Sequence, residues 1–462
     1  IISINQVVSK GNITFNTYGL AVNNGGNLSI DNFYSSEGIS ISSISNIEIE
    51  NAISNVNNGN EADVYINNNN NLNIYNLTES IYNGTFQGIS TAGLDIINLN
   101  QGNDNLQDIK INAYSNDPNS SPNGISISNG KSVIITNSYI NLPLVNASSS
   151  GYDIYIDSTK NSLLSNIVLS GANVISIINS NTTINEVSLT YSYSGINLVN
   201  SLSANVYEIR SFANGNTSKG SIFANNVSSL KVYETLSIGG LYGIITVNDN
   251  PLIYNNTIEN SVEGIMAEYS KNATIFENYV KNATSGINSA YSANVSIFSN
   301  EIIENKYGIG LIGVNHAYVF LNYFNNSKNV YVSNSNVTYN TKNKVEYTFN
   351  GNSFTNYLGN YWYGYNGNEI DSTGIGSKPY NTTYGLDSYP LTSIPSDYQV
   401  AGIATTQVSP PTVTVTTSSI TSTSTSTTQP ISTTSTSSVS TSSTNTQTST
   451  SSKSQTSSQA VS

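Results

Sequence analysis

Cysteine is absent from this chain of 462 residues, which has only one histidine, one methionine and one tryptophan. Without cysteine it can form neither a disulfide framework nor a thiolate metal site. The remaining soft or borderline metal donors are His316 and Met266, too few for a dedicated copper site. We therefore expect no cofactor and no metal centre built on such ligands.

Charge is also scarce, since charged residues make up 9% of the chain and Arg210 is its only arginine. The formal net charge is −13. Proteins that bind nucleic acid need a basic footprint for the phosphate backbone, so neither DNA nor RNA is an expected partner. Few charges also mean few ion pairs to lose when carboxylates are protonated, and we expect tolerance of strong acid.

Helical periodicity and long apolar runs are missing as well. Tyr, Asn, Ser, Thr and Ile dominate the composition, which favours strands over helices. The first residue is Ile1 rather than methionine, as expected of an exported protein whose targeting segment has been removed. Attachment to a membrane would then need an anchor beyond Ser462.

The strongest positive signal is an internal repeat between residues 243 and 326, where Gly264, Gly286 and Gly308 are spaced 22 residues apart. A period of this length is typical of a solenoid, in which stacked coils place equivalent residues about 4.8 Å apart. The repeat aligns two apolar columns (Ile253, Ile275, Ile297, Val319 and Ile258, Val280, Ile302, Phe324), one asparagine column (Asn256, Asn278, Asn300, Asn322) and one aromatic column (Tyr254, Phe276, Phe298, Phe320).

A coil of 22 residues with two or three short strands has no room for the crossover helices of other parallel folds. The sequence therefore predicts an all-β, right-handed parallel β-helix of about 14 coils over residues 1–354. Inward asparagines at a corner of each coil can hydrogen-bond along the stack as a ladder. The Tyr-rich segment 355–400 is predicted to be a C-terminal cap, and the Ser/Thr-rich segment 401–462 a disordered, O-glycosylated stalk.

Asn-x-Ser/Thr acceptors for N-glycans are frequent in the chain. Such acceptors matter only in exported proteins, so together with the predicted stalk they indicate an extracellular glycoprotein carrying N-glycans and O-glycans. The sixteen acceptors are Asn12, Asn27, Asn76, Asn83, Asn119, Asn146, Asn181, Asn216, Asn226, Asn255, Asn272, Asn282, Asn294, Asn325, Asn336 and Asn381.

Two sets of residues carry a family resemblance. The repeats, with Gly-Ile starts and asparagine-led apolar cores as at 278–281 and 300–303, resemble the NosD-type group of carbohydrate-binding and sugar-hydrolase (CASH) repeats. The ending is similar to that family's GNYW, GIG, PY and DxYPL motifs. The motif residues in this chain are Asn360, Trp362, Gly374, Gly376, Pro379, Asp387 and Pro390.

This resemblance implies a right-handed β-helix exported from the cell, and the stalked form is similar to archaeal surface proteins. It implies no single activity, and the copper-related role of the family's founding members lacks ligands here. Where the family's GIG segment is flanked by aspartates, this chain keeps Glu369 and Asp371. With Asn366 and Asn368 they form a hypothetical calcium site of oxygen ligands.

Candidate catalytic residues are few. A polysaccharide lyase needs a basic residue and cations for the substrate, and no basic cluster accompanies Arg210. Glu48 and Glu50, two apart on one strand, would place their carboxylates about 7 Å apart, within the range of inverting glycosidases. Asp153 and Asp157 would be too far apart, at about 13 Å. Glu48 and Glu50 are therefore the weak catalytic candidates, against the simpler interpretation of a solvated strand face.

The aromatic column of Tyr254, Phe276, Phe298 and Phe320 is the better functional candidate. By the family's repeat pattern these rings point outward, where sugars, a partner protein or another segment of the chain would cover them. We expect a non-enzymatic cell-surface glycoprotein, a rigid β-helical rod on a glycosylated stalk. It would act in envelope structure, adhesion, or binding of glycans or other envelope proteins. The alternative is a surface polysaccharide-degrading enzyme, either a lyase or a glycosidase.

Overall fold

A computed structural model describes residues 3–9, 12–16, 19–35, 38–57, 64–84, 91–97, 102–115, 123–142, 151–214 and 220–402. The chain divides into two units, Ile1–Pro411 and Thr412–Ser462. The predicted stalk at 401–462 lies outside the described residues, except for its first two. No helix in these ranges is long and apolar enough to cross a membrane.

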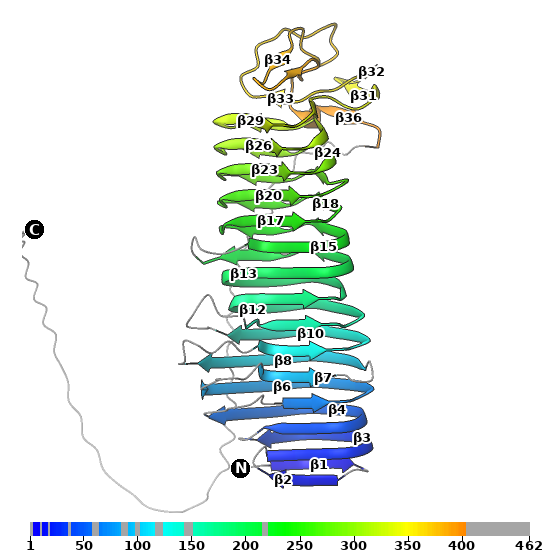
Figure 1. Cartoon of the computed structure of the whole chain (residues 1–462), viewed down its shortest axis with the longest axis vertical. Coiled ribbons are helices and arrows are strands. Elements are labelled where there is room, and N and C mark those ends of the chain that lie inside the picture. Colours follow the sequence, from blue (N-terminus) through cyan, green and yellow to red (C-terminus); the bar gives the residue numbers. More distant parts are fainter. Residues whose placement is uncertain are drawn as a thin grey trace, which may run out of the picture. The chain divides into compact units, whose positions relative to one another are not determined.

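The described residues wind into a right-handed parallel β-helix with almost no helix, which confirms the predicted fold (Figure 1). The solenoid has about 12 turns, slightly fewer than the predicted 14 coils, and over the described residues its first ladder contains fourteen parallel strand segments. These strands are β3 (Gly19–Ser35), β4 (Ile39–Asn57), β5 (Val64–Asn67), β7 (Thr91–Ile97), β9 (Asn123–Ser128), β11 (Ile154–Asp157), β12 (Asn161–Ile178), β13 (Asn181–Tyr207), β15 (Gly220–Tyr233), β17 (Tyr242–Val247), β20 (Glu263–Glu268), β23 (Ser285–Ala290), β26 (Tyr307–Ile312) and β29 (Lys328–Ser333).

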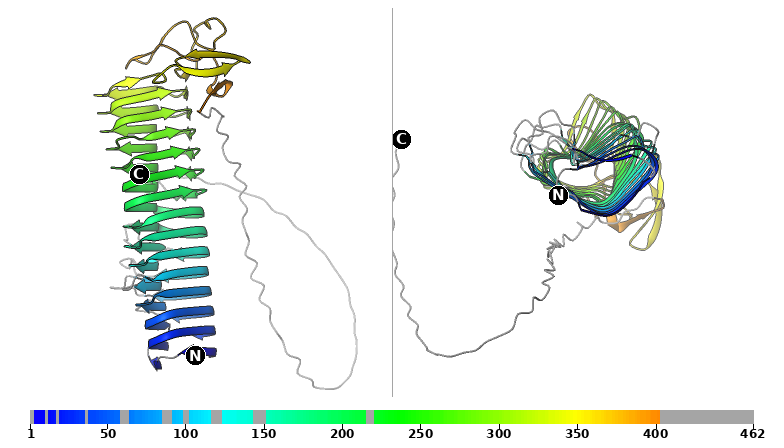
Figure 2. Two further views of the ribbon diagram at one scale, coloured as in Figure 1. Left: turned by 90° about the vertical axis from the view of Figure 1, so that its right-hand side faces the viewer. Right: turned by 90° about the horizontal axis from the view of Figure 1, so that it is seen from below.

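Two further ladders complete each coil, and the coils superimpose when viewed along the stack (Figure 2). The long strands β3, β4, β12, β13 and β15 turn corners and contribute to more than one ladder. The second ladder adds β6 (Asn71–Gly84), β8 (Asn103–Ser115), β10 (Ser132–Leu142), β18 (Pro251–Tyr254), β21 (Thr274–Phe276), β24 (Ala293–Phe298), β27 (Asn315–Phe320) and β30 (Val337–Thr338). The third adds β14 (Arg210–Ala213), β16 (Leu236–Ile238), β19 (Thr257–Glu259), β22 (Tyr279–Lys281), β25 (Glu301–Ile303), β28 (Tyr323–Asn325) and β33 (Tyr361–Trp362).

The core is one continuous cluster of aliphatic side chains running the length of the stack. Ile253 pairs in register with Ile275, and Ile275 with Ile297, so the predicted columns are stacked strand partners. Corners need left-handed backbone, which asparagine adopts more readily than most residues other than glycine. Asparagine accordingly supplies 18 of the 34 non-glycine residues described with positive φ. The corners therefore account for part of the asparagine-rich composition.

The N-terminal end is closed by strands β1 (Ser3–Ser9) and β2 (Asn12–Asn16), which pair antiparallel with β3. The repeat pattern did not predict this reversal. An exposed first strand would offer unpaired backbone groups to other chains, and the antiparallel pair occupies that edge.

The cap contains a sheet of β31 (Val345–Phe349), β32 (Asn352–Asn356) and β36 (Tyr398–Val400). It also holds the pair β34 (Tyr380–Asn381) and β35 (Leu386–Asp387), and the short 3₁₀ helix η1 (Pro395–Asp397). The strand pairing does not change from β-helix to cap at the predicted boundary, residue 354. The β31–β32 hairpin lies before it yet belongs to the cap sheet, and β33 lies after it yet pairs with β28 as the last strand of the third ladder.

Candidate functional site

The aromatic column is longer than the sequence predicted, because Tyr207 and Tyr233 continue it. Neighbouring ring centroids are 4.8 to 5.0 Å apart and the ring planes are within 10° of parallel. Each ring therefore stacks face to face on the next along the column. The six members are Tyr207, Tyr233, Tyr254, Phe276, Phe298 and Phe320.

This stacking decides what the column offers to a ligand. Five of the rings are half-buried and outward, whereas Phe320 is buried, and the faces of the rings within the column are occupied by neighbouring rings. Only ring edges, which carry the positive part of the quadrupole, remain for a ligand. At the C-terminal end, Phe320 shares a buried cluster with Tyr347 and Tyr398 of the cap. The column therefore joins coils to one another and to the cap.

The asparagine column forms a buried ladder. Asn256, Asn278, Asn300 and Asn322 are almost fully buried. Each Nδ2 donates to Oδ1 of the next asparagine at 2.9 to 3.0 Å, and the last bond goes to Asn360 of the predicted cap.

Asp387 lies at the C-terminal end of this ladder, next to Asn360. Its Oδ2 accepts the backbone N–H of Asn360 at 2.8 Å and the indole N–H of Trp362 at 2.9 Å. A Cβ at Gly359 would overlap the Asp387 carboxylate, so the glycine of the GNYW motif is needed for this approach. Burial raises the pKa of Asp387 to about 6 against the lowering effect of these donors.

The remaining motif residues of the cap hold its loops together. Gly374 has a φ of +76° and packs under the ring of Tyr398. The N–H of Gly376 donates to the carbonyl of Pro390 at 2.8 Å, whereas Pro379 is exposed. These residues therefore have structural contacts within the cap.

Glu48 and Glu50 both point away from the core, Glu48 exposed and Glu50 half-buried. Glu48 lies with Ser29 and Asn73 in a shallow surface hollow of β3, β4 and β6. The carboxylates of Asp153 and Asp157 do not share a face. Asp153 is fully buried, whereas Asp157 is half-buried and points outward.

We expect Glu48→Gln and Glu50→Gln to leave any hydrolysis of polysaccharide unchanged. Both glutamates are alternate residues on the outward face of β4, which is solvated. Reducing-end release from a panel of polysaccharides would measure this. A loss of turnover in either variant at unchanged folding would restore the catalytic interpretation.

The N-glycan acceptors fall into three groups. Two are half-buried, Asn181 and Asn325. Five lie where no side-chain placement is described: Asn12 and Asn83 in β2 and β6, and Asn119, Asn146 and Asn216 outside the described residues. The exposed acceptors are Asn27, Asn76, Asn226, Asn255, Asn272, Asn282, Asn294, Asn336 and Asn381.

The candidate metal ligands are not brought together. His316 is an exposed corner residue in β27, whereas Met266 lies on β20 of another ladder. Glu369 uses its carboxylate within the cap, accepting the N–H of Gly374 at 2.6 Å. Over the described ranges no three His, Asp or Glu residues converge as metal ligands. These donors do not fit a copper site.

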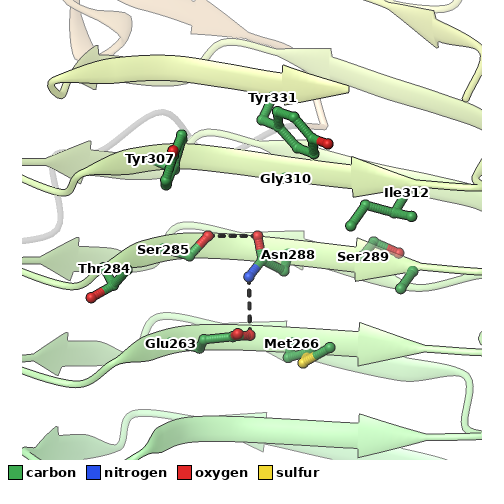
Figure 3. Close-up of a pocket in the computed structure, with 11 residues that line it drawn as sticks. Glu263, Met266, Thr284, Ser285, Asn288, Ser289, Tyr307, Gly310, Ile312 and Tyr331 are labelled. Atoms are coloured by element: carbon green, nitrogen blue, oxygen red, sulfur yellow. Dashed lines mark hydrogen bonds between the residues drawn. The ribbon is translucent and has the colours of Figure 1, made fainter. Parts of the chain in front are cut away.

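A groove on the outward side of the first ladder is the most chemically distinctive surface. It crosses β20, β23, β26 and β29 and has a volume of about 470 Å³ (Figure 3). The Nδ2 of Asn288 donates to Oε2 of Glu263 at 3.0 Å, and the hydroxyl of Ser285 donates to Oδ1 of Asn288 at 2.7 Å. A carboxylate, an amide and a hydroxyl are thereby held in fixed orientation.

Gly310 makes room for this arrangement. It follows Asn288 in register, and its φ is not in the left-handed region, so the backbone does not require glycine. A Cβ at this position would overlap Oδ1 of Asn288. The missing side chain therefore creates a hollow beside the amide.

Tyrosines wall the end of the groove nearer the cap. Tyr331 meets Tyr307 and Tyr384 edge to face, with centroids 6.3 and 5.9 Å apart. Neither neighbour stacks on Tyr331 as the rings of the aromatic column do. A second hollow of about 560 Å³ adjoins at Tyr307 and Tyr331 and reaches Tyr363 and Tyr384 of the cap. Tyr307, Tyr331 and Tyr384 therefore line this hollow without stacking on one another.

The fold and these surfaces define a parallel β-helix protein with an aromatic groove. Residues 208–367 match the family model described as periplasmic copper-binding protein (NosD). This match agrees with the NosD-like repeats predicted from the sequence, and the cap motifs from Gly374 to Pro390 lie beyond it. No curated protein matches the chain.

Solved structures similar to this chain include the periplasmic alginate epimerase AlgG, at 10% identity and a TM-score of 0.38. A point mutant of the same epimerase matches at 12% identity with the same TM-score. In both cases the match covers 69% of this chain and 85% of the other.

The groove was missed by sequence reasoning because its residues break the columns. In register, the outward positions read Met266, Asn288, Gly310 and Tyr331, which share no chemistry. A search for outward positions where a regular repeat becomes irregular would have found them.

Proposed function

We propose that this protein is an exported, non-enzymatic β-helical protein of the cell envelope that binds glycan chains in the groove of β20 to β29. The observation that carries the proposal is the hydrogen-bonded set of Glu263, Asn288 and Ser285 beside the unstacked ring of Tyr331. Binding sites for small polar ligands combine apolar walls with a few fixed polar groups. Sugars suit such a site because they present hydroxyls on one side and C–H surface on another.

The rest of the molecule supports a binding role rather than catalysis. The groove residues described include one carboxylate, Glu263, and it already accepts a hydrogen bond from Asn288. Glycoside hydrolysis uses two carboxyl groups in most families. An aligned stack of coils, joined to its cap by rings and amides, supports a rigid scaffold that holds this groove in one shape.

The proposal predicts that Tyr331→Ala and Asn288→Ala each weaken glycan binding at least tenfold, or about 1.4 kcal/mol. Tyr331→Ala removes a ring platform, and Asn288→Ala removes the amide that orients the groove's hydrogen bonds. A glycan array followed by isothermal titration calorimetry with the strongest ligand would measure the change.

Two matched variants separate the groove from other aromatic surfaces. Tyr34 is exposed on β3, outside the groove, and Tyr34→Ala should leave binding unchanged. Phe276→Ala disrupts the aromatic column and should lower stability without changing affinity, because the column presents only ring edges. The proposal fails if no glycan binds the wild type, or if Phe276→Ala weakens binding as much as Tyr331→Ala does.

A further inference from the structure

Positive charge lies beside Tyr307, which lines both the groove and the adjoining hollow, although the chain has only 15 lysines and arginines among its 462 residues. Two of them converge on one ring, since Nζ of Lys306 lies 5.5 Å and Nζ of Lys328 5.7 Å from the centroid of Tyr307. Both lysines are exposed. The one ion pair among the residues that the structure describes joins Lys281 to Glu304, so neither lysine is neutralised by a carboxylate.

Negative charge lies at the other end of the groove. Glu263 lines the groove on β20. The groove is therefore acidic towards β20 and cationic towards the cap, within a protein of net charge −13.

We propose that the groove selects an acidic glycan and fixes its direction. The anionic group of the glycan lies against Lys306 and Lys328, and its hydroxyls meet Glu263, Asn288 and Ser285. This inference rests on the proposed function and adds the ligand's charge class and orientation. Four successive strands about 4.8 Å apart line the groove, which is long enough for an oligosaccharide rather than a single sugar.

Charge complementarity is the physical basis of this selection. Two exposed ammonium groups attract an anion and repel a cation, and the effect weakens as salt screens it. The carboxylate of Glu263 would repel a second anion at the other end, so the reverse orientation is disfavoured. A neutral glycan would still meet the tyrosines and the Asn288 amide, but without this preference.

The test uses the full chain and three tetrasaccharide probes that share one neutral backbone: the unmodified form, a form with a single terminal uronic acid, and a form with a single terminal sulfate. By titration calorimetry at low salt, we expect the acidic probes to bind at least tenfold more tightly than the neutral one. Higher salt should reduce that difference. The double variant Lys306→Gln/Lys328→Gln should remove the preference and leave the affinity for the neutral probe unchanged.

Lys342 provides the matched control, because its Nζ lies 5.9 Å from the ring centroid of Tyr318, away from the groove. Lys342→Gln should leave all three affinities unchanged. Equal binding of acidic and neutral probes would overturn the acidic preference while leaving glycan binding intact. If Lys342→Gln and the double variant had equal effects, the acidic preference would be a general effect of net charge, and the proposal would also be overturned. Failure of every probe to bind would remove both proposals.

Discussion

Replacing Asn300 by alanine is expected to lower the free energy of unfolding by about 3 to 5 kcal/mol. The Nδ2 of Asn300 donates to Asn322 and to the carbonyl of Ile275, and its Oδ1 accepts from the backbone and side chain of Asn278. Alanine would leave these partners buried without hydrogen bonds, and desolvated groups of that kind cost more than the bonds themselves contribute.

Urea unfolding followed by far-UV circular dichroism would measure this loss. Asn315→Ala is the matched control, because Asn315 is exposed on β27 and its change should stay within about 0.5 kcal/mol. Trp362, the only tryptophan, is fully buried in the last coil, and its fluorescence reports separately on the cap. Matching unfolding midpoints for the wild type and Asn300→Ala would show that the ladder contributes nothing.

The second large effect concerns pH, and acid should stabilise this protein. Burial raises the pKa of Asp249 and of Asp387 from 3.8 to about 6, and raises that of Asp153 well above 3.8. Between roughly pH 4 and pH 6 the folded state therefore holds protons that the unfolded state releases. The stability these groups provide is fully present below pH 3.8 and is lost as the pH rises through about 6.

For Asp387 alone the raised pKa corresponds to about 3 kcal/mol. The surface ion pair of Lys281 and Glu304 opposes this effect only weakly, because water screens an exposed pair. Unfolding by urea at pH 4 and pH 7 should show the greater stability at pH 4. In Asp387→Asn the difference between the two pH values should shrink by about 2 kcal/mol, because at pH 4 an unfolded aspartate is still partly ionised. Stability that falls steadily from pH 7 to pH 4 would contradict this prediction.

Much of the fold could be predicted because the residues that specify it repeat. Ile275 and Asn278 recur every 22 residues, and identical environments in stacked coils require similar side chains. The reversal of β1 and β2 could not be predicted, since an end occurs once and leaves no period. The same limit applies to Asp387, whose motif identified the cap but not its contact with Asn360.

The outward residues were harder to interpret. The sequence placed Phe276 and Phe298 outside the core, but it could not show that their 5.0 Å stacking leaves only ring edges free. Tyr331 belongs to no column, and its importance comes from contacts with residues 24 and 53 positions away, Tyr307 and Tyr384. Periodicity therefore predicts the scaffold, whereas the groove depends on exceptions to it.

The asparagine ladder also has a polarity. The bonds between asparagine side chains, from Asn256 to Asn322, all run from Nδ2 to the next Oδ1 towards the C-terminal end, while each Nδ2 also donates to a carbonyl of the preceding coil. The side-chain carbonyl dipoles therefore share one direction along the stack. The aligned dipoles have their positive end at Asn360, where the carboxylate of Asp387 accepts the final hydrogen bonds. A negative group at the positive end of aligned dipoles is the arrangement that stabilises anions at helix N-termini. The asparagine side chains thus give this all-β stack a dipole along its length, with the positive end at the cap.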